Sequence, residues 1–141
     1  MTNIITLHYG IDGEDFSIAG EASSAVKKVL RQLGVKPEII RKVAISMYEA
    51  EINTVIHAGG GEADVEITPE KIYVRFSDNG PGIKDVSQAM QEGFSTASQK
   101  VREMGFGAGM GLPNMKNNVD DIKITSKPGK GTVVELTVFI K

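Results

Sequence analysis

Hydrophobic and polar positions repeat with two different periods along this chain, and each change of period marks the boundary of an element. Alternation with a period of two is typical of half-buried strands and occurs in three pairs of segments, each joined by a short turn. The predicted strands cover residues 3–9 and 14–20, 62–68 and 71–77, and 121–127 and 132–140. Helical spacing and boundary residues predict helices over residues 21–34, 37–57, 85–93 and 111–119.

The order of these elements predicts the fold class. Strands, helices, strands, a helix and strands follow one another, which indicates an α+β two-layer sandwich. We expect a mixed, mostly antiparallel sheet with the helices on one face. A chain of 141 residues is typical of one domain, so we assign residues 1–141 to a single unit.

Composition narrows the functions that this domain can have. The net charge is −2, so no strong field attracts nucleic acid or an anionic membrane. Cysteine is absent, which excludes disulfides and thiolate metal sites. No apolar run approaches the roughly 20 residues of a membrane span, and the N-terminus lacks the pattern of a signal peptide. We therefore expect a cytoplasmic protein that binds neither nucleic acid nor membrane.

The predicted helix over residues 37–57 carries a narrow polar line. Glu49 and Asn53 lie one turn apart on it with isoleucines on both sides, and His57 follows one turn later. A thin solvated strip accounts for such a line, and a helix-end role accounts for His57. A carboxylate one turn from an amide oxygen can also hold Mg²⁺ beside a hydroxyl, because Mg²⁺ prefers oxygen ligands and takes few from protein when phosphates supply the rest. The residues alone leave both interpretations open.

Glycines form clusters after this helix. Twelve of the sixteen follow residue 58, and such clusters indicate tight turns or close approach of backbone to a ligand. Asp78 follows a predicted strand in "SDNGPGI", where it either closes the turn or accepts a hydrogen bond from an exocyclic amine such as that of adenine. "GFGAGMGL" (105–112) leads into a helix, and backbone N–H groups at a helix start bind phosphate. It is neither a Walker loop nor a dinucleotide fingerprint.

Taken together, four motifs resemble those of the GHKL ATPase family, which has the Bergerat fold. They are "EAEIN" (49–53) for the N box, "DNGPGI" (78–83) for the G1 box, "GFGAGMGL" (105–112) for the G2 box and "GKGT" (129–132) for the last glycine box. They occur in the family's order. The small size and the phrase "DNGPGIKDVSQAMQEGFSTAS" are similar to the bacterial anti-sigma factor serine/threonine kinases and the stressosome-associated serine kinases.

The resemblance implies a role for each matching residue. Glu49 acts as general base or orients the attacking hydroxyl, Asn53 binds Mg²⁺, Asp78 binds adenine and Thr132 reaches adenine, often through water. The other residues implied to contact ATP are Gly80, Gly82, Ile83, Gly105, Gly107, Gly109, Met110, Gly111 and Leu112. The segment before the G2 box would form a lid. Its Lys100 and Arg102 either reach the γ-phosphate or form a solvated charge run.

The resemblance also implies a reaction and partners. It predicts a serine/threonine kinase that transfers phosphate from Mg·ATP to a small STAS-domain antagonist, for which a sigma factor or a phosphatase competes. It also predicts a homodimer. One alternative is a nucleotide-gated protein-binding switch with little transferase activity, although a pure switch has no need of Glu49. A detached histidine-kinase catalytic domain is a further alternative, but 141 residues leave no room for a dimerisation helix pair with a phosphoacceptor histidine.

Overall fold

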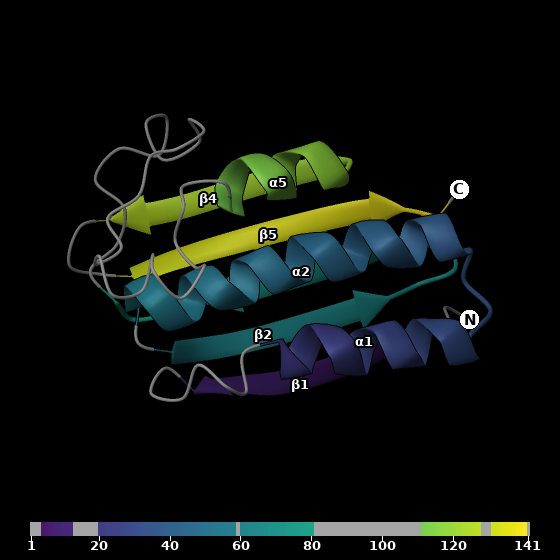
Figure 1. Cartoon of the computed structure of the whole chain (residues 1–141), viewed down its shortest axis with the longest axis horizontal. Coiled ribbons are helices and arrows are strands. Elements are labelled where there is room, and N and C mark those ends of the chain that lie inside the picture. Colours follow the sequence, from purple (N-terminus) through teal and green to yellow (C-terminus); the bar gives the residue numbers. More distant parts are fainter. Residues whose placement is uncertain (1–3, 13–19, 59, 81–110, 128–130, 141) are drawn as a thin grey trace.

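The computed structural model describes residues 4–12, 20–58, 60–80, 111–127 and 131–140. Within them, five strands form one sheet and three helices lie on one face of it (Figure 1). The strands are β1 (Ile5–Asp12), β2 (Gly60–Ile67), β3 (Lys71–Ser77), β4 (Asp121–Lys127) and β5 (Gly131–Phe139). The helices are α1 (Glu21–Gln32), α2 (Pro37–Ala58) and α5 (Gly111–Asn118). This arrangement confirms the predicted two-layer α+β sandwich.

The strand order is β1-β2-β3-β5-β4, and every neighbouring pair is antiparallel. β2 and β3 form the predicted hairpin around Pro69 and Glu70. The last strand, β5, lies between β3 and β4, so Val133 near its start pairs with Ser77 at the end of β3. Asp78, the next residue, therefore lies beside the first residues of β5. The sheet order thus joins two predicted motifs that are more than fifty residues apart in sequence.

One face of the sheet and the inner sides of the helices form the core. Every second residue of the three central strands is buried, as expected for half-buried strands: Ala63, Val65, Ile67, Ile72, Val74, Phe76, Val134, Leu136 and Val138. α2 lies along the middle of this layer, with α1 on one side and α5 on the other (Figure 1). Fully buried residues of the three helices, among them Leu30, Met47 and Met115, face the sheet. Each such side chain contributes about 1.5–3 kcal/mol to stability through its burial.

The other face of the sheet carries charges of alternating sign. The register aligns His8, Asp64, Arg75, Glu135 and Lys123 in one row across all five strands. Directly opposed side chains in such a row interact, and opposite charges are favourable. At one end, His8 Nδ1 lies 2.7 Å from Asp64 Oδ1, and this carboxylate raises the pKa of the exposed imidazole above its ordinary value of 6.5. This row is a solvated face, in contrast to the core face.

Tyr73 lies next to this row on the same face. Its hydroxyl donates a 2.5 Å hydrogen bond to Glu135. Partial burial, followed by this hydrogen bond, raises the pKa of Tyr73 to about 12, so the phenol stays protonated and keeps donating at neutral pH.

Some predicted elements differ from the structure or lie outside it. β1 continues to Asp12, three residues beyond the predicted end of the first strand. Gly20, expected to end the second strand, instead occupies the N-cap position of α1 with φ of 102°. The rest of that strand, the helix over 85–93 and the lid lie outside the described residues.

Candidate functional site

α2 presents Glu49 and Asn53 on a half-buried side of the helix, one turn apart as predicted. The side-chain amide of Asn53 makes no hydrogen bond within the described part of the chain, so its oxygen remains available to a ligand. Ser46, about one turn before Glu49 on the same side of α2, does not extend this polar line. Ser46 is only 1% exposed, and its hydroxyl donates to the carbonyl of Lys42. Ser46 is therefore a buried residue whose hydroxyl is satisfied within its own helix.

A second acid of the N box, Glu51, has a structural role that the sequence did not reveal. Its side chain is 2% exposed and accepts three backbone hydrogen bonds from the start of α1. Gly20 N and Ala22 N donate to Oε2 at 2.8 and 3.2 Å, and Ser23 N donates to Oε1 at 3.1 Å. These N–H groups have no partner inside their own helix, and a negative charge there also interacts favourably with the helix dipole. Glu51 therefore caps α1 from α2.

Gly20 makes this cap possible. It adopts a left-handed conformation and has no side chain that could cap the helix itself. A Cβ atom at this position would lie 3.0 Å from the ring of Tyr48, which is three residues before the capping Glu51 on α2. The ring of Tyr48 and the carboxylate of Glu51 thus both engage the first turn of α1, and this fixes α1 to the part of α2 that carries Glu49.

Asp78 connects the end of β3 with the start of β5. Its Oδ1 accepts hydrogen bonds from Gly80 N at 2.9 Å and from Thr132 N at 3.1 Å. Its own N–H donates to the carbonyl of Thr132 at 3.0 Å. The first contact is the turn-closing bond that the sequence allowed. The other oxygen, Oδ2, accepts no hydrogen bond within the described residues, so the carboxylate closes its turn and still has an acceptor left for a ligand.

Thr132 is held in place by β4. It is 9% exposed, and its hydroxyl lies 2.9 Å from the hydroxyl of Ser126, either of which could donate. Ser126 also donates to the carbonyl of Gly131 at 3.2 Å. No sequence pattern singled out Ser126, because only the pairing of β4 with β5 brings it to this position. Asp78, Gly80 and Thr132, predicted separately, therefore form one cluster.

Two glycines allow the backbones to meet around Asp78. A Cβ atom on Gly131, which has φ of 89°, would lie 2.0 Å from the carbonyl oxygen of Asp78. A Cβ atom on Gly61 would lie 3.0 Å from Thr54 Cγ2 and 3.1 Å from Asp78 Cβ. Thr54 is the residue after Asn53, so the C-terminal half of α2 approaches the Asp78 cluster at Gly61. The structure thus brings the N box and the first residues of the G1 box to the same end of the molecule.

The remaining predicted residues lie at or beyond the limits of the described chain. α5 begins at Gly111, as predicted for the helix after the G2 box. The side chains of Leu112 and His57 are not among those described. Outside the described residues lie Gly82, Ile83, Lys100, Arg102, Gly105, Gly107, Gly109 and Met110. Their roles stay predictions.

The described donors fit a magnesium–nucleotide complex better than a metal held by protein alone. No group of three His, Asp or Glu side chains that could enclose a metal occurs in the described ranges. Asn53 offers one amide oxygen beside the half-buried Glu49. Such a sparse donor set suits Mg²⁺ when phosphates and water complete the coordination.

Comparison with known proteins identifies the family. Residues 40–141 match the family model described as "Histidine kinase-, DNA gyrase B-, and HSP90-like ATPase". The chain belongs to this family. The match includes all four motifs as well as Glu51, Ser126 and the glycines at 61 and 131, so the predicted GHKL membership is confirmed.

Relatives and solved structures agree with this assignment. The chain is 34% identical over 124 residues to an "Anti-sigma F factor" of Caldanaerobacter subterraneus. This match covers 84% of this chain and 83% of the relative. It is 26% identical over 119 residues to the "Serine/threonine-protein kinase RsbT" of Bacillus subtilis, covering 82% and 84%. The fold is similar to that of the RsbU and RsbW domains of Rv1364c from Mycobacterium tuberculosis, with a TM-score of 0.65 at 17% identity. That likeness covers 95% of this chain and 32% of the other.

None of the helices in the described ranges combines the length and hydrophobicity needed to cross a membrane.

Proposed function

We propose that this protein is an ATP- and Mg²⁺-dependent serine/threonine protein kinase of the anti-sigma factor type. One observation carries the proposal. Asp78 shares a hydrogen-bonded cluster with Gly80 and Thr132, and this cluster meets the C-terminal half of α2 at Gly61. This proximity supports assigning Asp78, as the adenine acceptor, and the Glu49–Asn53 pair to one site. The similarity to anti-sigma F factors and to the RsbT kinase supports the choice of reaction.

At the base end of the site, Asp78 Oδ2 accepts a hydrogen bond from the adenine amino group, while Oδ1 stays bonded to the backbone of Gly80 and Thr132. The hydroxyl of Thr132 takes part in adenine recognition through water. Because the protein already holds Asp78 and Thr132 in place, these two residues need little further ordering when ATP binds.

At the phosphate end, Asn53 supplies one oxygen ligand for Mg²⁺, which neutralises charge on the phosphates when bound. Glu49 accepts the proton of the attacking serine or threonine hydroxyl. The hydroxyl oxygen forms a bond to the γ-phosphorus, the bond between that phosphorus and the β–γ bridging oxygen breaks, and ADP leaves with the bridging oxygen. Catalysis then rests on positioning and charge stabilisation.

The proposal includes a protein substrate and an assembly. The substrate is a small STAS-domain antagonist, and a sigma factor or a phosphatase competes for it. The kinase acts as a homodimer in the cytoplasm, with residues 1–141 as one domain. The names of the anti-sigma and RsbT relatives support a partner-switching system of this kind.

The decisive experiment is phosphate transfer from γ-labelled ATP, with Mg²⁺, to purified STAS-domain proteins encoded near this gene. We expect label on a serine or threonine of one of them. The Glu49→Ala variant should lose at least a hundredfold in transfer rate, since general bases contribute about 10²–10⁴-fold, while binding ATP as before. Asn53→Ala should weaken nucleotide binding only when Mg²⁺ is present.

The rival function is a nucleotide-gated switch, and the same assay separates the two. Binding of ATP and of a partner without transfer to any STAS protein would favour the switch. Loss of ATP binding in Glu49→Ala would contradict the role of base, because a residue acting on the hydroxyl proton should leave nucleotide affinity nearly unchanged.

A further inference from the structure

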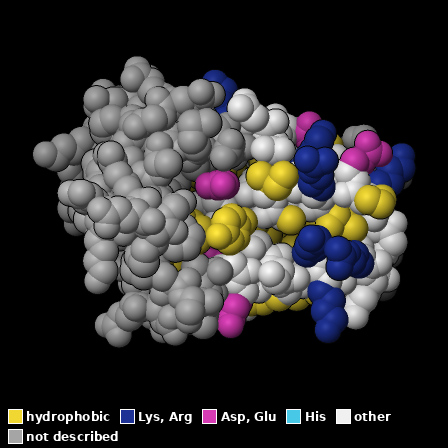
Figure 2. All heavy atoms as spheres, viewed as in Figure 1, with side chains coloured by type: hydrophobic (Ala, Val, Ile, Leu, Met, Phe, Trp, Pro, Cys, Tyr) yellow, Lys and Arg dark blue, Asp and Glu magenta, His cyan; other side chains and the backbone are white. Residues whose placement is uncertain are grey.

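Basic side chains gather at one end of the α1–α2 pair. Six of the sixteen Lys and Arg residues of the chain lie between residues 27 and 42, but only one of the eighteen acidic residues does. The six are Lys27, Lys28, Arg31, Lys36, Arg41 and Lys42. Figure 2 shows dark blue side chains around exposed hydrophobic ones where α1 ends and α2 begins. A chain of net charge −2 therefore has a local positive surface.

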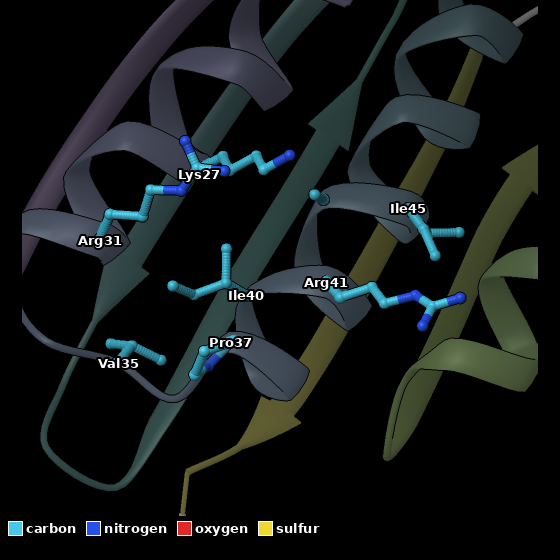
Figure 3. A pocket seen from close by; sticks show the side chains of 8 residues that line it. Lys27, Arg31, Val35, Pro37, Ile40, Arg41 and Ile45 are labelled. Atoms are coloured by element: carbon cyan, nitrogen blue, oxygen red, sulfur yellow. The ribbon is translucent and has the colours of Figure 1, made fainter.

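A groove of about 610 Å³ lies within this surface, between α1 and α2. Its apolar lining residues are Val35, Pro37, Ile40, Ala44 and Ile45, and we call the first four of them the floor. We call this feature the basic groove. Figure 3 shows Val35 and Ile40 facing the space between the helices and Lys27 reaching from α1 towards α2. Arg41 and Ile45 point away from that space. The floor is thus apolar, and the positively charged side chains of Lys27 and Arg31 form the rim of the basic groove.

Within the described part of the chain, no carboxylate neutralises the two cations beside the floor, Lys27 and Arg31. No carboxylate of the described residues lies within 4.0 Å of the charged groups of Lys27 or Arg31. Val35 and Ala44 in the floor are half-buried, so part of this apolar surface is in contact with solvent. A ligand that offers apolar groups and carboxylates together should therefore bind favourably here. Its apolar groups would be buried against the floor, and its carboxylates would pair with the positive charges.

We propose that the basic groove binds an acidic amphipathic helix of a partner protein. Apolar side chains on one face of such a helix would cover Val35, Ile40 and Ala44, and flanking Asp or Glu residues would pair with Lys27 and Arg31, as in other helix-in-groove complexes. The concave shape suits a rounded helix better than a flat lipid surface. The apolar floor suits it better than a nucleic acid backbone, whose affinity comes from phosphate contacts.

The basic groove is separate from the candidate nucleotide site. On α2, Ile40 is thirteen residues from Asn53, about 20 Å along the helix axis, and Ala44, at the near end of the floor, is nine residues from Asn53, about 13 Å. Binding in the groove should therefore not require a bound nucleotide. The inference goes beyond the proposed kinase activity, because it concerns a second surface whose ligand is a protein segment.

The test is selection from a phage-displayed library of random 16-residue peptides against the full chain, followed by fluorescence anisotropy with the enriched peptides. We expect enriched peptides to have apolar residues at helical spacing and at least two acidic residues. Their affinity should fall at least tenfold in Lys27→Glu/Arg31→Glu and in Ala44→Glu, which places a carboxylate in the floor. It should also fall as salt is raised, because exposed ion pairs are screened.

Two control variants should still bind the peptides. Lys116→Glu/Lys123→Glu makes the same change in net charge on α5 and β4, and Asp78→Asn alters the nucleotide site, so both should bind the peptides within twofold of the unsubstituted protein. Circular dichroism checks that the groove variants fold. The proposal is wrong if no peptide is enriched, if enriched peptides lack acidic residues, or if they bind the groove variants normally. It is equally wrong if the Lys27/Arg31 variant instead loses self-association, binding to anionic vesicles or binding to duplex DNA.

Discussion

Replacing Glu51 tests whether α1 is capped from α2. An alanine at this position would leave three buried N–H groups, those of Gly20, Ala22 and Ser23, without the carboxylate that accepts from them at 2.8–3.2 Å. A hydrogen bond to a charged group contributes about 1.5–3 kcal/mol, and contributions within one cluster are not additive. We therefore expect Glu51→Ala to lower the free energy of unfolding by about 3–5 kcal/mol, in the range seen when one partner of a buried charged interaction is removed.

Glu51→Gln refines the prediction. Glutamine keeps one acceptor oxygen but presents an amide NH₂ to the remaining donors. Glu51→Gln should lower the free energy of unfolding by about 1.5–3 kcal/mol, less than Glu51→Ala does. Urea unfolding, with m unchanged between variants, measures both values. In thermal unfolding, Glu51→Ala should lower Tm by roughly 10–20 °C for a domain of this size. Hydrogen exchange at Ala22 and Ser23 should accelerate as well.

The matched control is Glu70→Ala, which removes an exposed carboxylate from the turn between β2 and β3. It should change stability by no more than about 0.5 kcal/mol. A Glu51→Ala protein within about 1 kcal/mol of the unsubstituted chain would refute the reasoning, because three donors left without their acceptor should cost more than that. Equal stability of Glu51→Gln and the unsubstituted protein would show that the negative charge has no role.

Three further predictions concern other parts of the structure. Gly131→Ala should lower the free energy of unfolding in urea by more than about 2 kcal/mol, because the added Cβ would meet the carbonyl of Asp78. Gly10→Ala should change this free energy little, because a Cβ there meets no other atom within 4 Å. NMR titration should give His8 a pKa above 6.5 that returns to the ordinary value in Asp64→Asn. The folded state binds this proton more tightly, so the stabilisation is complete below pH 6.5 and disappears as pH rises through the raised pKa. Asp78→Asn should abolish ATP binding in calorimetry with Tm nearly unchanged, because asparagine keeps Oδ1 for the backbone; normal binding would exclude the adenine role.

Much of the fold could be predicted because local patterns determine it. The hairpin of β2 and β3 follows from alternation on both sides of Pro69-Glu70, and α2 begins at the predicted Pro37 and ends one residue beyond the prediction, at Ala58. The position of β5 between β3 and β4 could not be predicted in this way. It depends on pairing between segments more than fifty residues apart, and no local period encodes such a pairing.

The site was predicted in part for a similar reason. Asp78 and Thr132 were recognised separately by their motifs, and the structure shows that they are neighbours. Glu51 was missed because it is a charged residue inside a motif whose other members suggested ligand binding. The available signal was Gly20, since a helix that begins at glycine without a capping side chain needs an acceptor from elsewhere. Ser126 offered no comparable signal, because its hydrogen bond to Thr132 exists only through the β4–β5 register.

The cap on α1 also bears on how the chain matures during its synthesis. Ribosomes extend the chain from its N-terminus, so the start of α1 is made about thirty residues before Glu51 exists. β1 likewise pairs with β2, whose last residue is Ile67. An isolated helix of 12 residues is marginal in water. The first third of the polypeptide should therefore remain unfolded and accessible to proteases and chaperones until residue 67 has left the ribosomal exit tunnel. It should then fold together with the N box.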